Sequence, residues 1–400
     1  MPSFVIAGAG LAAAKAAETL RDEGFDGDIV LLGSERELPY ERPPLSKGLL
    51  LGSDSRDSVF VHDADWYASH NVDFRAGTTV IAIDRAATSV VLDGSEQLHY
   101  DKLLLATGAS PRRLGFPGSD REEVLYLRTL QDSERLKRAF QAGTRVVVAG
   151  AGWIGLETTA AARAADCPVT VLEPQPSALH DQVGPELGAV FADLHREHGV
   201  EFRFGEKAAE FRPGLVVTDS GAEIPADILV VGIGAAPNTE LAARAGLEVD
   251  NGVLTDAALR TSDLNVFACG DVANSFNPTL GRRIRVEHWA NALNGGPAAA
   301  RSMLGQSVSY DAVPYFFSDQ YDLGMECAGV PAPGSYDQVV YRGDPSTREF
   351  VAFWLSASTV VAGMNVNVWD VNDDIQSLIR SGRQPDLARL TNPDIPLTEV

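Results

Sequence analysis

The chain has 400 residues, 45% of them hydrophobic, and a formal net charge of −22. This length allows two or three domains with cores of their own. The negative charge argues against nucleic acid and anionic membranes as partners, and no apolar run is long enough to span a bilayer. Because residues 1–3 lead straight into an apolar run, no signal peptide and a cytoplasmic location are expected.

The first predicted elements form a β-α-β unit. A strand at residues 4–7 runs into Gly8-Ala9-Gly10-Leu11-Ala12-Ala13, which matches G-x-G-x-x-G/A. Glycines in this pattern permit a tight turn and let backbone approach a pyrophosphate at a helix N-terminus. A helix is expected over about residues 12–23 and a second strand at 29–32. Gly33 occupies the usual position of the ribose-binding acid, so that role passes to Ser34 or Glu35.

A proline-stiffened loop, residues 38–47, follows and leads into a short helix. Arg42 and Lys47 can project from it toward a phosphate or a flavin ring, although an exposed turn is the simpler interpretation of this stretch alone. Strands around residues 79–83 and 89–92 predict a small antiparallel crossover sheet.

The second β-α-β unit is more complete than the first. A strand at residues 146–149 precedes Gly150-x-Gly152-x-x-Gly155, an Ala-rich helix follows, and a strand at 169–172 ends on Glu173. Glu173 stands where a carboxylate would accept hydrogen bonds from ribose hydroxyls. It would repel a 2′-phosphate, and no arginine follows nearby, so NAD(H) is favoured over NADP(H).

The two halves repeat each other beyond the glycines. Residues 100–111 and 226–237 each carry an Asp, an apolar strand and a Gly-Ala-x-Pro ending. Two dinucleotide sites in one chain are typical of a flavoprotein that oxidises a nicotinamide. A further strand ends on Gly270-Asp271, which places Asp271 at the carboxyl edge of a sheet, where it can accept from ribityl hydroxyls.

Other polar residues give weaker signals. The three cysteines form no C-x-x-C, so no dithiol, iron–sulfur cluster or zinc site is expected, and Cys269 is predicted to be buried. His195 and His198 are interpreted as a solvated helix face, and no metal site is predicted. The basic cluster Arg282, Arg283 and Arg285 is either a solvated loop or a docking patch.

The predicted fold class is α/β, with two doubly wound Rossmann-like dinucleotide-binding domains and a C-terminal α+β domain. We expect residues 1–112 and 239–317 to bind FAD, residues 113–238 to bind NAD, and residues 318–400 to form the C-terminal domain. Strands at residues 337–341, 349–355 and 359–366 and a helix at 373–381 are predicted within that last domain.

Together these segments resemble the NADH-dependent, putidaredoxin-reductase-like ferredoxin reductases of oxygenase systems, which have the glutathione-reductase fold. The resemblance spans essentially the whole chain. Its most specific marks are Arg42-Pro43-Pro44-Leu45-Ser46-Lys47, Ala106-Thr107-Gly108, Leu127-Arg128-Thr129-Leu130, Gly270-Asp271, and Pro314 through Ser318-Asp319-Gln320.

The resemblance implies a set of cofactor-binding residues. Positions that fall on FAD contacts are Ala12, Ser34, Glu35, Lys47, Val80, Arg128, Asp271 and Trp289; positions that fall on NAD contacts are Gly152, Ile154, Gly155, Glu157, Glu173 and Gly234. The expected cofactor-binding set also includes Gly8, Gly10, Arg42, Ala106, Gly108, Gly150 and Glu287.

The resemblance also implies a reaction. Disulfide reductases of this fold carry a redox cysteine pair where this chain has Pro43-Pro44-Leu45-Ser46-Lys47, so electrons must leave the flavin for an external acceptor. Hydride from NADH would pass to FAD, with Lys47 and Glu157 as the catalytic pair, and single electrons would go to a [2Fe–2S] ferredoxin that serves a P450 monooxygenase or a Rieske-type dioxygenase. A rubredoxin reductase, an NADH oxidase and a redox-sensing flavoprotein like the apoptosis-inducing factors are the alternatives.

Overall fold

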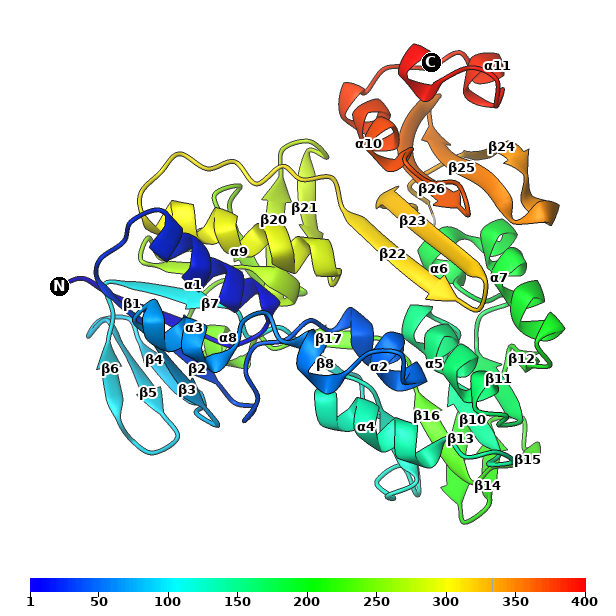
Figure 1. Ribbon diagram of the computed structural model, residues 1–400, viewed down its shortest axis with the longest axis horizontal. Coiled ribbons are helices and arrows are strands. Elements are labelled where there is room, and N and C mark those ends of the chain that lie inside the picture. Colours follow the sequence, from blue (N-terminus) through cyan, green and yellow to red (C-terminus); the bar gives the residue numbers. More distant parts are fainter. Residues whose placement is uncertain (333) are drawn as a thin grey trace. The chain divides into compact units, whose positions relative to one another are not determined.

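The computed structural model describes residues 1–332 and 334–400 (Figure 1). The chain folds into two compact units, each built from separate stretches of sequence. Unit 1 comprises residues 1–42, 56–110 and 235–314, and unit 2 comprises residues 43–55, 111–234 and 315–400.

Unit 1 is organised around a parallel sheet of order β19-β7-β1-β2-β3. Its strands are β1 (Ser3–Ala7), β2 (Asp28–Gly33), β3 (Val72–Ala76), β7 (Lys102–Leu105) and β19 (Val266–Ala268). Side chains alternate across the sheet: Phe4 and Ile6 pack into a core with α1 (Leu11–Asp22) and α9 (Trp289–Met303), whereas Val5 and Ala7 join a second core on the other face. Both faces are therefore buried, as in a doubly wound domain.

Smaller elements complete unit 1. The predicted crossover sheet is present as β4 (Val80–Asp84), β5 (Ser89–Leu92) and β6 (Gln97–His99), and a further sheet consists of β18 (Val253–Thr255), β20 (Ala273–Asn277) and β21 (Arg282–Arg285). Two short strands, β8 (Ala109–Pro111) and β17 (Ala235–Pro237), pair with each other. The remaining helices are α3 (Ala64–Ser69) and α8 (Glu240–Arg244), with 3₁₀ turns at Arg56–Val59 and Gly270–Val272.

Unit 2 repeats the parallel-sheet plan. Its strand order is β12-β11-β10-β16-β9, from β12 (Glu201–Phe204), β11 (Val169–Glu173), β10 (Val146–Ala149), β16 (Ile228–Val231) and β9 (Val124–Tyr126). Its helices are α2 (Gly48–Leu51), α4 (Leu130–Ala139), α5 (Trp153–Ala164), α6 (His180–Val183) and α7 (Pro185–Glu197). A 3₁₀ turn covers Pro43–Ser46, and β13 (Ala208–Arg212), β14 (Leu215–Thr218) and β15 (Glu223–Pro225) form a small antiparallel sheet.

Each of the two parallel sheets has an equivalent pair of hydrogen bonds at the start of its central strand. In unit 1 the amide of Ser3 donates to Asp101 Oδ2 at 2.6 Å, and the amide of Asp101 donates to the Ser3 carbonyl at 2.7 Å. In unit 2 Arg145 and Asp227 exchange the equivalent bonds, each 2.8 Å long. The Asp that precedes the returning strand in each half therefore has the same structural role, which confirms the repeat inferred from the sequence.

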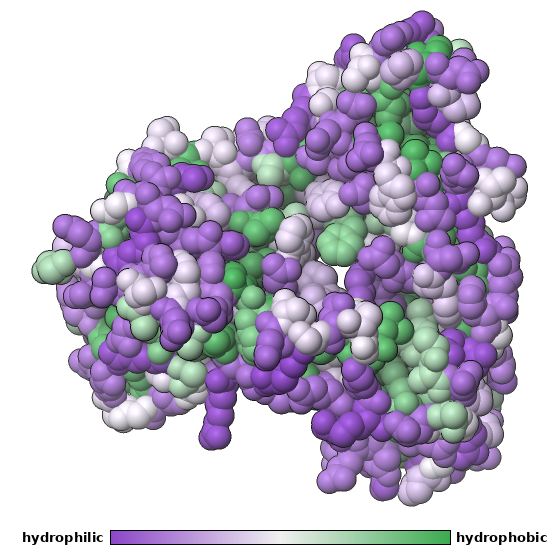
Figure 2. Space-filling view, viewed as in Figure 1, coloured by the Kyte–Doolittle hydropathy of each residue, from purple (hydrophilic) through white to green (hydrophobic). Residues whose placement is uncertain are grey.

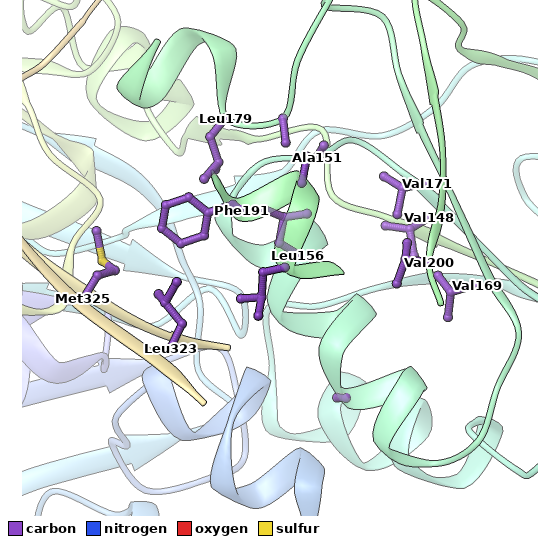
Figure 3. Close-up of a cluster of buried hydrophobic side chains, with 14 of the residues drawn as sticks. Val148, Ala151, Leu156, Val169, Val171, Leu179, Phe191, Val200, Leu323 and Met325 are labelled. Atoms are coloured by element: carbon purple, nitrogen blue, oxygen red, sulfur yellow. The ribbon is translucent and has the colours of Figure 1, made fainter. Parts of the chain in front are cut away.

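The C-terminal region of unit 2 is an antiparallel sheet of order β22-β23-β26-β25-β24. The strands are β22 (Tyr315–Gln320), β23 (Leu323–Gly329), β24 (Gln338–Asp344), β25 (Glu349–Ser356) and β26 (Thr359–Val366), followed by α10 (Asn372–Ser381) and α11 (Leu387–Leu390) with 3₁₀ turns at Pro345–Thr347 and Leu397–Glu399. This sheet shares one hydrophobic core with the parallel sheet. Figure 3 shows Leu156 and Phe191 beside Leu323 and Met325 in that core.

No helix among the described residues is both long enough and apolar enough to cross a membrane. On the face shown in Figure 2, hydrophilic side chains cover most of the surface, and hydrophobic ones are scattered between them.

Candidate functional site

The first candidate site in unit 1 is the turn between β1 and α1. Gly8 has φ +114°, and a Cβ placed on it would lie 2.1 Å from the Ala106 carbonyl oxygen, so only glycine fits. Gly10 is the opposite case: its Cβ would meet no described atom within 4 Å beyond its chain neighbours, and no side chain caps α1 there. The turn thus leaves space at a helix N-terminus whose amides lack a side-chain cap, which fits a pyrophosphate.

The residues expected to bind the rest of the flavin nucleotide gather around this turn. Ala12 is covered by α9, which approaches closely because it has a glycine at position 296. A Cβ added to Gly296 would lie only 2.3 Å from the Ala12 carbonyl oxygen. Gly270, at φ +71°, would place a Cβ 3.2 Å from Ala12 Cβ, so Asp271 follows immediately beside the turn. Gly108 has φ +66° and continues the chain after β7.

The ribose end of this site holds two candidate residues in different environments. Ser34 is exposed, whereas Glu35 is half-buried and accepts a 2.6 Å hydrogen bond from the Tyr40 hydroxyl. Arg42 Nη2 lies 3.4 Å from Glu35 Oε1. Arg42 is therefore oriented by Glu35 instead of being an unattached surface cation.

Three further predicted residues lie elsewhere in unit 1. Trp289 opens α9 and donates from Nε1 to Glu41 Oε2 at 3.2 Å, and Glu287 pairs with Arg285. Val80 is the first residue of β4 and packs, half-buried, against a core of the unit.

The predicted basic cluster is not a loop. Arg282–Arg285 form strand β21, which pairs with β20. Arg283 Nη1 donates to the carbonyl oxygens of Thr255 and Asn274, at 2.5 and 3.2 Å, and Arg285 is paired with Glu287. Two of the three guanidinium groups are thus engaged inside unit 1.

In unit 2 the second glycine turn likewise has glycines that leave no room for a Cβ and one that faces open space. Gly150, at φ +101°, and Gly155 have backbone oxygens 2.4 and 2.1 Å from where a Cβ would lie, whereas at Gly152 the nearest lies 4.0 Å away. No side chain caps α5 at Gly152. Ile154 in the first turn is 44% exposed, which leaves an apolar surface beside these amides.

Glu173, the last residue of β11, hydrogen-bonds to this glycine turn. Its Oε2 accepts from the Ala151 amide at 2.7 Å and its Oε1 from the Gln175 amide at 2.9 Å. Both oxygens keep lone pairs for further donors. Gly234, at φ +90°, follows β16, and Arg128 precedes the capping box in which Thr129 and Asp132 start α4.

The expected pair of Lys47 and Glu157 forms within unit 2. Lys47 Nζ lies 2.6 Å from Glu157 Oε1, and the side chains are 16% and 4% exposed. Two serines that stand in the family marks but were given no role complete the environment: Ser318 Oγ lies 2.7 Å from Oε1, and Ser46 Oγ hydrogen-bonds Oε2. Lys47 Nζ also lies 5.3 Å from the centre of the Phe317 ring.

The prediction of a solvated face on α7 is wrong for His195. His198 is exposed, but His195 has no exposed surface and hydrogen-bonds Gln320 at 2.9 Å. Burial lowers the pKa of His195 to about 4. The signal was present in the sequence, because Leu187, Phe191 and His195 recur at intervals of four along one helix face.

The cysteines are buried, and burial raises the pKa of each thiol, to about 12 for Cys269. They are therefore poor nucleophiles. None of them lies in the segment 43–47, which ends on Lys47, the residue before α2, so that segment brings no thiol to the Lys47–Glu157 pair.

The family model for pyridine nucleotide-disulphide oxidoreductases matches residues 2–296, and the reductase C-terminal model matches residues 315–400. The chain belongs to the pyridine nucleotide-disulphide oxidoreductase family. This confirms the predicted fold class and oxidoreductase chemistry with FAD and NADH.

Individual relatives span the whole chain. The ferredoxin–NAD(+) reductase component of the anthranilate 1,2-dioxygenase system of Burkholderia cepacia is 42% identical over 98% of both chains. Putidaredoxin reductase of Pseudomonas putida is 37% identical over 91% of this chain and 88% of its own. A solved covalent complex of putidaredoxin reductase with putidaredoxin superimposes with a TM-score of 0.96 at 35% identity, over 100% of this chain and 97% of that one.

Proposed function

We propose that this chain is an NADH-dependent ferredoxin reductase that passes electrons singly to a [2Fe–2S] ferredoxin, and through it to a P450 monooxygenase or a Rieske-type dioxygenase. The observation that carries the proposal is the buried Lys47–Glu157 pair where a disulfide reductase would need a cysteine pair. The names of the whole-length relatives support the choice of acceptor. A cytoplasmic location is part of the proposal, because NADH is available there.

The residues present fit both nucleotides. The open Gly10 and Gly152 positions and the uncapped starts of α1 and α5 suit two pyrophosphates. Bound FAD would supply the chemistry that joins a two-electron hydride donor to a one-electron acceptor. We assign FAD to residues 1–112 and 239–317, NAD to residues 113–238, and a C-terminal domain to residues 318–400.

Each nucleotide would be held by its own set of residues. We assign to FAD the contacts of Gly8, Gly10, Ala12, Ser34, Glu35, Arg42, Lys47, Val80, Ala106, Gly108, Arg128, Asp271, Glu287 and Trp289. We assign to NADH the contacts of Gly150, Gly152, Ile154, Gly155, Glu157, Glu173 and Gly234.

Lys47 and Glu157 would carry the catalytic step. Lys47 would stabilise negative charge that develops next to it during hydride transfer, and Glu157 would hold the ammonium group in position through their 2.6 Å contact. No nucleophile and no general base are needed.

The test is anaerobic steady-state turnover with NADH or NADPH as donor and a [2Fe–2S] ferredoxin, a rubredoxin or oxygen as acceptor. We expect fast ferredoxin reduction with NADH and little with NADPH. Fast reduction of rubredoxin or oxygen with an idle ferredoxin would refute the proposed acceptor and leave the family unaffected.

Glu173→Ala tests the donor assignment in the same assay. Loss of the ribose acceptor should raise KM for NADH about tenfold and leave kcat nearly unchanged. Gln175→Ala is the matched control, because Glu173 bonds only the backbone amide of that residue, and it should leave KM unchanged. An unaltered KM in Glu173→Ala would contradict the assignment.

A further inference from the structure

A continuous series of hydrogen-bonded side chains crosses unit 2 and ends on Glu157. The Tyr321 hydroxyl lies 3.2 Å from His195 Nδ1, and His195 Nε2 lies 2.9 Å from Gln320 Oε1. Gln320 Nε2 then lies 3.1 Å from Ser318 Oγ, which lies 2.7 Å from Glu157 Oε1. The four inner side chains are each no more than 4% exposed. We call this series the donor chain.

The carboxylate at its end fixes the direction of every bond. Ionised Glu157 can only accept, so the single hydroxyl proton of Ser318 is donated to it. Ser318 Oγ must then accept from the amide nitrogen of Gln320, which turns the Gln320 carbonyl toward His195. That carbonyl requires a proton on His195 Nε2.

The direction of the outermost hydrogen bond, between Tyr321 and His195, follows from the charge of His195. Burial lowers the pKa of this histidine to about 4, so at neutral pH the ring is uncharged and Nδ1 accepts from the Tyr321 hydroxyl. Burial also raises the pKa of Tyr321, which keeps its proton. All four bonds therefore donate toward Glu157, and dipoles aligned in this way strengthen one another.

The backbone at Tyr321 supports a specific role for this arrangement. Tyr321 has φ +56°, which is unfavourable for a bulky residue, in the two-residue connection between β22 and β23. Its ring is stacked on exposed His198 at 3.7 Å, while its hydroxyl reaches His195. Backbone strain of this kind persists where surrounding contacts hold it.

We propose that Ser318, Gln320 and His195 are positioning residues for the catalytic pair: the donor chain aims the Glu157 carboxylate at Lys47 and stabilises its negative charge. The inference rests on the proposed role of Lys47 and Glu157. It gives the C-terminal sheet a part in the reaction, because Ser318 and Gln320 lie on β22. The donor chain does not conduct protons, since the Gln320 carboxamide between Ser318 and His195 would have to pass through a rare tautomer.

The test uses the full-length holoenzyme with ¹³C-labelled glutamate side chains. The Glu157 carboxyl resonance is assigned by its loss in Glu157→Gln. Gln320→Met removes both the carbonyl and the NH₂ end of the side-chain amide at similar volume. We expect this variant and Ser318→Ala to shift the Glu157 resonance and the midpoint potential of the bound flavin. Flavin reduction by NADH should slow about tenfold, the effect of losing one hydrogen bond to a charged group.

His198→Ala is the matched control, because His198 directly follows the last residue of α7, three positions after His195, and stacks on the same tyrosine but is exposed and outside the donor chain. It should change none of the three readouts. If Ser318→Ala and Gln320→Met lower only the melting temperature and leave the Glu157 resonance and the potential unchanged, the donor chain is merely structural and the inference is wrong. The parent enzyme's activity with ferredoxin tests the proposed function separately.

Discussion

At the residue scale, the Lys47–Glu157 pair sets the first expectation. Removing one partner of a buried ion pair leaves the other charge uncompensated, so Lys47→Met and Glu157→Gln should each lower the free energy of unfolding by about 3 kcal/mol. The double variant should recover most of that stability but not the rate of flavin reduction. Urea unfolding and stopped-flow kinetics measure both. A double variant as unstable as the sum of the singles would show that the two side chains are not coupled.

His195 makes stability depend on pH. Its pKa is lowered by burial to about 4, so between this value and the ordinary 6.5 the unfolded chain binds a proton that the folded chain does not. The free energy of unfolding should therefore fall as the pH falls from about 6.5 to 4, by up to about 3 kcal/mol. His288, whose pKa burial also lowers to about 4, acts in the same window.

The measurement is chemical unfolding at several pH values for the parent and for His195→Gln. The variant should have a flatter curve, and the difference isolates His195 from His288. Parallel curves would show that His195 is protonated equally in both states.

The sequence predicted some of these residues and not others. The glycines and Glu173 belong to motifs with known chemistry, whereas Lys47 and Glu157 were expected as a pair from the family resemblance, and that pair is present. Ser46, Ser318 and Gln320 stand in the family marks but were given no role, and His195 was assigned to a solvated face, because nothing in the spacing of these residues shows that they meet around Glu157. Only the three-dimensional structure brings Ser318 within 2.7 Å of a residue 161 positions earlier.

At the scale of elements, the glycine turns permit a paired substitution. Gly10→Ala should fold normally, because the added methyl meets open space, but should weaken FAD binding more than about tenfold by filling the phosphate cradle. Gly8→Ala should fail to fold stably, because its Cβ would lie 2.1 Å from a carbonyl oxygen at φ +114°.

FAD titration and circular dichroism distinguish the two variants. Normal FAD affinity in Gly10→Ala would exclude this turn as the phosphate site. The equivalent pair in unit 2, Gly152→Ala and Gly150→Ala, should behave in the same way toward NADH.

Strongly patterned elements were predictable to within a residue or two. β10 and β26 have the expected bounds, and α1 begins and ends one residue before its predicted limits. β22 was missed because its buried positions are the polar Ser318 and Gln320, whereas exposed Asp319 lies between them. β21 was not predicted, and a solvated loop was one of the two interpretations of its arginines, because three arginines conceal a strand whose charged side chains bond to neighbouring carbonyls.

At the scale of the whole molecule, the net charge of −22 opposes an acidic ferredoxin, so docking needs local positive charge. Arg282 and Arg283 are both exposed, but only Arg282 has a side chain for which the described residues provide no contact, since Arg283 and Arg285 bond internally. Arg282→Glu should lower kcat/KM for ferredoxin about threefold at low ionic strength, and the difference should vanish near about 0.5 M salt.

Turnover with ferricyanide is the control for Arg282→Glu and should be unchanged, because that small acceptor needs no protein docking surface. A matching loss with both acceptors would show that the substitution damages the enzyme instead of the docking step.

The interleaving of the two units has a consequence for biosynthesis. The sheet of unit 1 is finished by β19, and unit 2 receives β22 to β26 only from residue 315 onward. Neither unit can therefore be completed while the first two-thirds of the polypeptide leaves the ribosome, although multidomain proteins commonly fold one domain at a time from the N-terminus. The nascent chain must keep the unpaired edge of β7 protected over more than 150 residues of further translation, so this protein should depend on chaperones during synthesis more than a tandem arrangement of the same domains would.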